Sequence, residues 1–104
     1  MKKKIVIVFL TFNSEKTIRS SILSASRISK NIYVIDSFSN DKTLAICKKL
    51  NCKIIKRKFK NYSDQRNWAI KRFNKKYIWQ LHLDADENLN FNAVKSIKKI
   101  ILSK

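Results

Sequence analysis

Segments that favour strands alternate with segments that favour helices along the whole chain, and this alternation limits the folds open to it. Apolar runs rich in β-branched residues predict four strands, at residues 4–10, 31–36, 52–57 and 77–83. Apolar residues at helical spacing predict helices at residues 15–28, 41–50, 63–73 and 90–102. Strands buried on both faces and connected by helices are typical of a parallel sheet. We therefore expect an α/β fold with a mostly parallel sheet flanked by helices.

The fourth predicted strand ends in a group of carboxylates. Asp84 and Asp86 follow the apolar run one residue apart, so a strand would deliver both to the same side, and Glu87 comes next. These three acids are a large share of the total, because the chain has 7 Asp and Glu residues against 24 Lys and Arg. Hard cations such as Mg²⁺ or Mn²⁺ prefer oxygen ligands and share their sites with phosphates. The pattern indicates a metal–phosphate site, with a polar turn or a helix cap at Asp86 as the alternative.

Polar segments also follow the first and second predicted strands. Parallel strands end at the same edge of a sheet, and ligands bind beyond that edge where the strand order reverses. We therefore expect one crevice to bring together the polar residues of three loops, namely Thr11, Asn13, Glu15, Asp36, Ser37, Asp41, Asp84 and Asp86.

Four segments occur in the order and spacing found in a known family of enzymes. They read TFNSE at 11–15, VIDSFSNDKT at 34–43, QRNWA at 65–69 and LDADE at 83–87. In these segments the chain resembles the family 2 glycosyltransferases of GT-A fold, and it is most similar to the lipopolysaccharide-core glucosyltransferase-like branch. The resemblance extends from residue 4 to about residue 89. It implies that residues 1–104 form a single domain, the N-terminal nucleotide-sugar-binding part of a truncated GT-A fold.

The resemblance also implies roles for the residues around the nucleotide. Thr11 and Asn13 would line the nucleotide pocket, and Glu15 would lie near the ribose or the base. Asp36 would accept a hydrogen bond from a uracil-like base, as suits a carboxylate facing an N–H donor. The alternative for Asp36 is a cap on the helix that begins at Asp41.

A second set of implied roles concerns the diphosphate. Arg66 would reach the pyrophosphate, although it could equally be a surface arginine on a helix. Asp84 would contact the ribose or a metal-bound water, and Asp86 would bind the Mn²⁺ or Mg²⁺ that bridges the diphosphate, so that both belong to the metal site. His82 is interpreted as a packed side chain, not a ligand.

The implied reaction is metal-assisted transfer of a sugar from a UDP-linked donor to a cell-envelope glycan or a lipid-linked acceptor, as in lipopolysaccharide biosynthesis. An inverting enzyme of this class needs a carboxylate base to deprotonate the acceptor. In the family that base lies beyond the segment that corresponds to Lys104, so we expect an incomplete or split form. The expected location is cytoplasmic, and the lysine-rich surface leaves open a peripheral contact with anionic lipid at the inner face of the membrane.

The formal net charge of +17 implies an anionic partner without selecting one. A competing hypothesis is a basic nucleic-acid-binding module with an acidic metal site. Nucleic acid is not the favoured partner, because the aromatic residues fit the core periodicity and show no stacking platform. A third hypothesis is a non-catalytic remnant that keeps only the fold.

The chain contains neither Gly nor Pro, so Asn, Ser, Asp and Lys must form its turns. Asn13 or Ser14 is predicted to cap the first helix, and Ser39 or Asn40 the second. Phe38 stands where members of the family usually have Gly, at a tight loop that favours positive φ. Cys47 and Cys52 are interpreted as small, buried hydrophobic residues.

Overall fold

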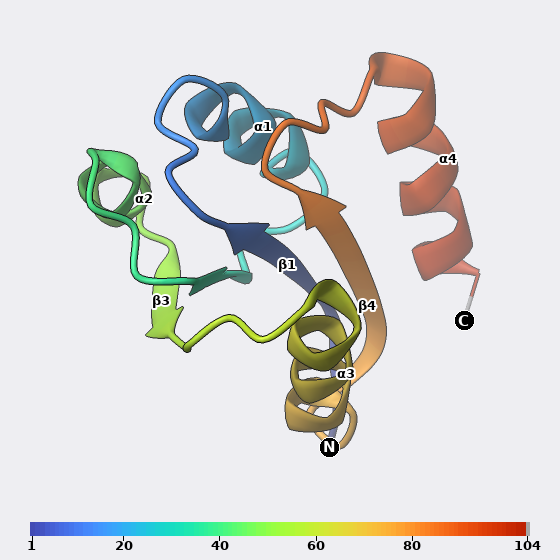
Figure 1. Ribbon diagram of the computed structural model, residues 1–104. Coiled ribbons are helices and arrows are strands. Elements are labelled where there is room, and N and C mark those ends of the chain that lie inside the picture. Colours follow the sequence, from blue (N-terminus) through green and yellow to red (C-terminus); the bar gives the residue numbers. More distant parts are fainter. Residues whose placement is uncertain (104) are drawn as a thin grey trace.

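The computed structural model describes residues 1–103, and every strand and helix expected from the sequence is present (Figure 1). The elements follow one another along the chain as β1 (Lys3–Thr11), α1 (Ile18–Ala25), β2 (Ile32–Asp36), α2 (Thr43–Lys49), β3 (Lys53–Lys56), α3 (Tyr62–Phe73), β4 (Tyr77–Asp84) and α4 (Phe91–Leu102).

The four strands form a parallel sheet in the order β3-β2-β1-β4. The order reverses at β1, because the chain first adds β2 and β3 on one side of it and then adds β4 on the other. The register places Thr11 opposite Asp36, and Leu10 opposite Asp84. The carboxyl ends of β1, β2 and β4 therefore lie side by side, as a parallel α/β sheet requires.

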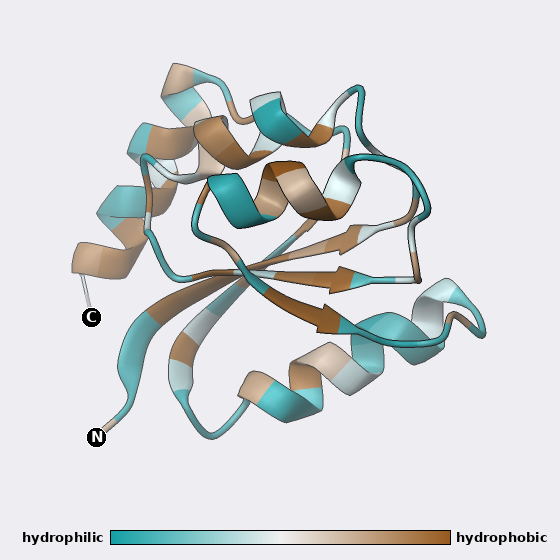
Figure 2. Cartoon of the chain, turned by 90° about the vertical axis from the view of Figure 1, so that its left-hand side faces the viewer, coloured by the Kyte–Doolittle hydropathy of each residue, from teal (hydrophilic) through white to brown (hydrophobic). Residues whose placement is uncertain are grey.

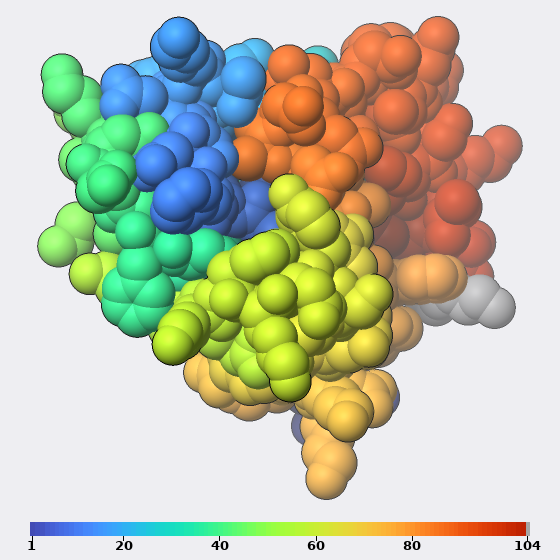
Figure 3. All heavy atoms as spheres, in the orientation of Figure 1, coloured from blue at the N-terminus to red at the C-terminus, as the bar shows by residue number. Residues whose placement is uncertain are grey.

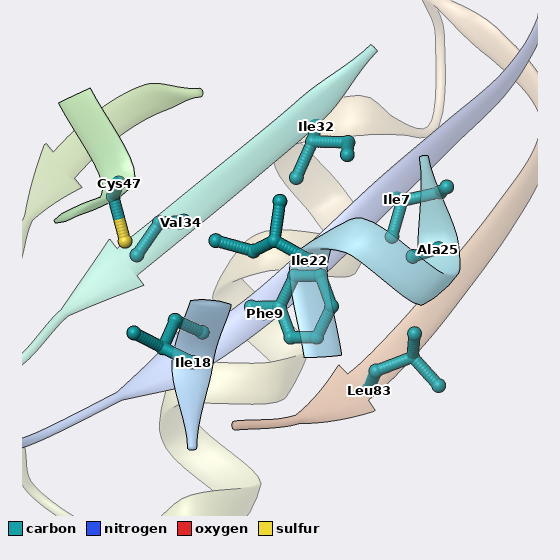
Figure 4. Close-up of a cluster of buried hydrophobic side chains, with 9 residues drawn as sticks. All are labelled: Ile7, Phe9, Ile18, Ile22, Ala25, Ile32, Val34, Cys47 and Leu83. Atoms are coloured by element: carbon teal, nitrogen blue, oxygen red, sulfur yellow. The ribbon is translucent and has the colours of Figure 1, made fainter. Parts of the chain in front are cut away.

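The central strand β1 is covered on both faces, since α1 and α2 lie on one side of the sheet and α3 on the other (Figure 2). Successive side chains of a strand point to opposite faces. Ile7 and Phe9 accordingly pack with α1, where Figure 4 shows Phe9 beside Ile22, while Val6 and Val8 pack toward α3. This double burial explains why the run at 4–10 is apolar without alternation.

The first helix is shorter than its sequence pattern indicated. The chain forms a turn before α1, in which the amides of Thr17 and Ile18 both donate to the carbonyl oxygen of Ser14, and the helix begins only at Ile18. Leu23, an apolar residue of this helix, is exposed. Neither Asn13 nor Ser14 caps α1, because its N-cap residue is Thr17 and makes no side-chain capping bond.

The other helix starts are set by different residues from those predicted. Neither Ser39 nor Asn40 caps α2, and the amide of Thr43 instead donates to the Asp41 carboxylate at 2.8 Å. Helix α3 starts one residue earlier than expected, with the Asn61 side chain accepting from the Asp64 amide at 2.8 Å. These departures are local, because several short polar side chains in each loop compete for the same amides.

Helix α4 lies beyond the free edge of β4 (Figure 1) and is only partly covered. Val94 and Ile101 are buried, whereas Phe91 and Ile100 are exposed.

Among residues 1–103, three have positive φ, namely Asn13 (46°), Phe38 (61°) and Asn51 (63°). Asn tolerates the left-handed region through its short polar side chain, whereas a bulky residue there is strained. The positive φ predicted at the position of Phe38 is therefore confirmed.

We expect Phe38→Gly to be more stable than Phe38→Ala by about 1 kcal/mol, because only the alanine keeps the Cβ that disfavours positive φ. Both variants lose the same exposed ring, so the pair isolates the backbone effect. Urea unfolding of the two proteins measures the difference, and equal midpoints would show that the loop relaxes to negative φ.

Candidate functional site

A cavity of about 1340 Å³ opens at the carboxyl ends of β1 and β4, beside the first turns of α3. Figure 3 shows the hollow between the blue segment after β1, the yellow-green atoms of α3 and the orange segment after β4. The expected convergence of the three loops is found here, and the predicted site residues that line the cavity are Thr11, Asn13, Glu15, Arg66, Asp84 and Asp86.

Asp36 does not line the cavity, because its side chain is completely buried. One carboxylate oxygen accepts from Thr11 Oγ1 at 2.6 Å and from Ser39 Oγ at 2.7 Å, and the other accepts from the Ser39 amide at 2.7 Å. The carboxylate therefore joins the ends of β1 and β2 to the loop that follows β2. It does not cap α2, which was the alternative interpretation.

A second set of hydrogen bonds joins the loop after β1 to the loop after β2. The side-chain oxygen of Asn13 accepts from the Asn40 amide at 2.9 Å, while the Asn13 amide donates to Ser39 Oγ at 2.8 Å. Glu15 accepts from the Lys42 amide at 3.2 Å, and its own amide donates to Asp41 at 3.3 Å. Asn13 and Glu15 thus border the cavity and at the same time hold its wall together.

Helix α3 is fixed against the same wall by Arg57. The guanidinium donates to Asp64 at 2.8 Å and to the buried Gln65 at 2.6 Å, and it lies 5.0 Å from the centre of the Trp68 ring. The hydrogen bond from Arg57, against a smaller opposing effect of burial, lowers the pKa of Asp64. Gln65 also donates to Ser37 Oγ at 3.3 Å, which links α3 to the end of β2.

Arg66 projects from α3 toward the carboxylate pair. Its guanidinium lies 3.2 Å from Asp84, in an ion pair that remains open to solvent. Such an exposed pair contributes little to stability, so the arginine is free to exchange its partner for another anion.

The turn that carries Asp84 and Asp86 is closed by Glu87. The Glu87 carboxylate accepts from the Asp84 amide at 2.7 Å, and the Glu87 amide donates back to the Asp84 carbonyl at 3.1 Å. The N-cap of α4 is Asn90, so Asp86 is not a helix cap. Within residues 1–103 the Asp86 carboxylate is exposed and makes no hydrogen bond or ion pair with the protein.

Asp84 and Asp86 suit a hard divalent cation that draws its remaining ligands from elsewhere. Both are exposed oxygen donors at the rim of one cavity. In the described part of the chain, no three His, Cys, Asp or Glu side chains are grouped to hold a metal ion by themselves. Mg²⁺ commonly takes one or two carboxylates and completes its shell with waters and substrate phosphates. The pair therefore fits a metal that binds together with a diphosphate.

The remaining titratable groups near the sheet are packed. Burial, with a smaller contribution from Arg66, lowers the pKa of His82 to about 4, and its Nε2 lies 2.8 Å from the Gln80 side-chain oxygen. Burial raises the pKa of the Cys47 thiol to about 12 and that of Cys52 to about 11. All three groups are thus neutral at pH 7. Cys47 is buried as the sequence indicated, whereas Cys52 is only partly buried.

Three aromatic side chains that were not predicted as site residues line the cavity. Phe12, Phe59 and Tyr62 are 58%, 44% and 70% exposed, and the rings of Phe59 and Tyr62 meet nearly edge to face at 5.2 Å. The interpretation of the aromatic residues as core is wrong for these three. The available signal was their position in polar segments, outside the apolar runs.

Residues 6–102 match the sequence profile of glycosyl transferase family 2. The chain is 32% identical over 103 residues to an uncharacterized glycosyltransferase of Rickettsia bellii, and 33% identical over 101 residues to one of Rickettsia typhi. These alignments cover 99% and 97% of this chain and 34% of each relative. The chain therefore belongs to glycosyl transferase family 2 and spans about a third of the length of these relatives.

The fold agrees with solved glycosyltransferase structures of GT-A type. The chain superposes on S. aureus TarS 1–349 with a TM-score of 0.73 and 25% identity, covering 97% of this chain and 33% of that one. Structures of TarS 1–349 in complex with UDP and with UDP-GlcNAc give TM-scores of 0.72 and 0.73, again at 25% identity. Each covers 97% of this chain and 32% of the TarS chain. The α/β sheet expected from the sequence is thus that of a GT-A glycosyltransferase.

We expect Asp36→Ala to lower the free energy of unfolding by about 3 kcal/mol, because it leaves buried donors of Thr11 and Ser39 without an acceptor. Asp86→Ala is the matched control, since it removes an exposed carboxylate and should change stability by less than about 0.5 kcal/mol. Urea unfolding of both variants measures the contrast. Similar losses of unfolding free energy in the two variants would contradict the role of Asp36 in joining the ends of β1 and β2 to the loop after β2.

The free energy of unfolding should depend on pH because burial lowers the pKa of His82 in the folded protein. The folded protein keeps this imidazole neutral down to a pKa of about 4, whereas the unfolded chain binds the proton near pH 6.5. Folding stability attributable to His82 should therefore fall as the pH drops from about 6.5 to 4, by about 1 kcal/mol per pH unit. A His82→Gln variant should lack this component, and parallel pH profiles for variant and wild type would contradict the assignment.

Proposed function

We propose that this chain binds the nucleotide-diphosphate-sugar donor of a glycosyltransferase reaction, with UDP as the nucleotide. The observation that carries the proposal is the meeting of an arginine and two exposed carboxylates at one cavity rim, at the carboxyl edge of a parallel sheet. Support comes from TarS, whose superposable domain has been solved with UDP and with UDP-GlcNAc. The bound state would place the diphosphate at this rim.

The nucleoside would occupy the part of the cavity bordered by Thr11, Asn13 and Glu15. Asn13 and Glu15 would present the loop backbone and their remaining lone pairs to the ribose or base. Asp36 is proposed as the acceptor for a uracil-like base, and in the present conformation it would act through Thr11 and Ser39, the two side chains that its carboxylate holds. A direct contact with the base would require the loop at Ser39 to move.

The diphosphate would be held by Arg66 and by the carboxylate turn. Arg66 would transfer from Asp84 to a phosphate oxygen, since a guanidinium forms charge-assisted hydrogen bonds with phosphate. Asp84 and Asp86 would hold Mg²⁺ or Mn²⁺, and Asp84 would also reach the ribose or a metal-bound water. When bound, the ion would supply Lewis-acid stabilisation of the charge that develops on the departing diphosphate.

The acceptor side of the reaction is assigned to sequence outside these 104 residues. The catalytic base of an inverting mechanism would come from that sequence, and the 104-residue chain would form one donor-binding domain without turnover of its own. This agrees with the coverage of about a third of the relatives. We further propose the lipopolysaccharide-core branch, with a cell-envelope glycan or lipid-linked acceptor.

The proposed location is the cytoplasm, with peripheral contact between the basic surface and anionic lipid. A net charge of +17 favours such contact. Among residues 1–103 no helix has both the length and the apolar character needed to cross a bilayer.

A second candidate function, binding of single-stranded nucleic acid, is favoured by one observation. Three exposed aromatic rings surround the cavity of a strongly basic chain, and base stacking on such rings is a common mode of binding single strands. A remnant that keeps the fold and binds nothing is the third hypothesis.

Calorimetric titration of UDP and UDP-glucose, with and without Mn²⁺, tests the donor site. We expect Mn²⁺-dependent binding by the wild type and a loss of roughly tenfold or more in Asp86→Asn, which keeps the shape of the side chain and removes a charged metal ligand. Asn92→Ala, an exposed change in α4 outside the cavity lining, is the control and should bind as the wild type does.

Two other outcomes would each favour a different hypothesis. Salt-sensitive binding of random single-stranded DNA that is unchanged in Asp86→Asn would favour the nucleic-acid function. A folded wild type that binds neither UDP nor DNA would identify the remnant.

A further inference from the structure

The segment that carries the carboxylate turn is anchored along one side of α1 by polar side chains. Ser21 Oγ donates to the carbonyl of Ala85 at 2.9 Å, and Ser20 Oγ donates to the Asn88 side chain at 2.9 Å. Further along, the Leu89 amide donates to Ser24 Oγ at 3.0 Å, and Arg27 donates to the Leu89 carbonyl at 2.8 Å. Figure 1 shows the orange segment after β4 running beside α1.

These anchoring residues share a stripe of the helix because they recur at helical spacing. They are Ser20, Ser21 and Ser24 of α1, together with Arg27 in the turn that follows the helix. Ile18, Ile22 and Ala25 occupy the neighbouring stripe and pack on the sheet. Helix α1 thus has one face for the core and another for the segment 85–89.

Ser21 occupies the most consequential place in this stripe. Its side chain is completely buried, and its partner is the carbonyl of Ala85, the residue between Asp84 and Asp86. The Ala85 side chain packs against the core cluster under α1. With its side chain and its carbonyl both fixed, Ala85 turns the two flanking carboxylates outward, and both are exposed.

We propose that Ser21 is a positioning residue for the metal site, one that orients Asp84 and Asp86 by holding the carbonyl of Ala85. The proposal rests on the proposed function, because it needs a metal to bind at that turn. Residues that hydrogen-bond the ligand-bearing segment without touching the metal commonly set the geometry and affinity of a site. The Glu87 carboxylate accepts from the Asp84 amide on the solvent side of the same turn. The turn is thus held by Glu87 on one side and by Ser21 on the other.

The effect of Ser21→Ala on the affinity for the metal distinguishes a positioning role from a merely structural one. A carbonyl released from its donor would let the turn sample orientations in which the two carboxylates no longer face one ion. We expect the affinity for Mn²⁺ in the presence of saturating UDP to fall roughly tenfold. Binding of UDP without metal should change by less than about twofold, as expected of a change remote from the ligand.

Ser26→Ala is the matched control. This serine lies just beyond the end of α1, and its hydroxyl donates at 2.8 Å to the Leu23 carbonyl, within the same helical turn. It should leave both affinities as in the wild type. Ser24→Ala serves as a second variant if Ser21→Ala fails to fold, because Ser24 holds the Leu89 amide and is less buried.

Calorimetry gives the affinity for Mn²⁺, and amide hydrogen exchange gives a readout independent of the metal. Exchange at residues 85–89 should be faster in Ser21→Ala than in Ser26→Ala, with no difference in β1. Unchanged Mn²⁺ affinity in a folded Ser21→Ala variant would overturn the positioning role while leaving the donor site intact. Absence of Mn²⁺–UDP binding in the wild type would overturn both.

Discussion

The pairing of β1 with a parallel neighbour on each side is the constraint on which the rest of the structure depends. It makes β1 a central strand, which the flanking helices cover on both faces and which therefore requires an unbroken apolar run. It also places the ends of β2 and β4 beside the end of β1. Loops that are far apart in sequence are then forced together at a single edge. The cavity exists because three strands end there and α3 closes one flank.

The edge where these strands end also collects most of the negative charge of a basic protein. Of the seven acids, Glu15, Asp36, Asp41, Asp84, Asp86 and Glu87 lie in or beside the loops that follow the strands, and Asp64 is paired with Arg57 in the first turn of α3. Their tasks differ. Asp36 and Glu87 satisfy amides and hydroxyls of the loops, whereas Asp86 is left without a partner among residues 1–103. The carboxylates that shape the loops accept hydrogen bonds from neighbouring donors, whereas the Asp86 carboxylate remains open where a cation would neutralise it.

Much of this arrangement could be predicted from the sequence, because hydrophobic periodicity reflects burial and burial determines topology. The runs at 4–10 and 31–36 predict the two central strands, and the position of Thr11 follows from the first. The run at 77–83 predicts the strand that ends at Asp84 and Asp86. The polar loops were harder to predict. The Asn13 side chain could cap a helix or accept from the Asn40 amide, and the outcome depends on which amide lies nearest in the folded protein. Helix and turn propensities do not contain that information. The buried bond of Ser21 to Ala85 was missed for the same reason. The exposure of Phe59 and Tyr62, by contrast, was signalled by their position in polar segments.

The absence of glycine bears on the thermodynamics of ligand binding as well as on the shape of the loops. Asn13 and Phe38 hold the positive φ angles that glycine would ordinarily supply, at the two loops joined by Asp36 and Ser39. A side chain at these positions narrows the range of backbone conformations open to the free protein. Loops already restricted in this way have less conformational entropy to lose when a ligand fixes them. The backbone strain retained at Phe38 thus accompanies loops that have less conformational freedom than glycine at the same positions would give them.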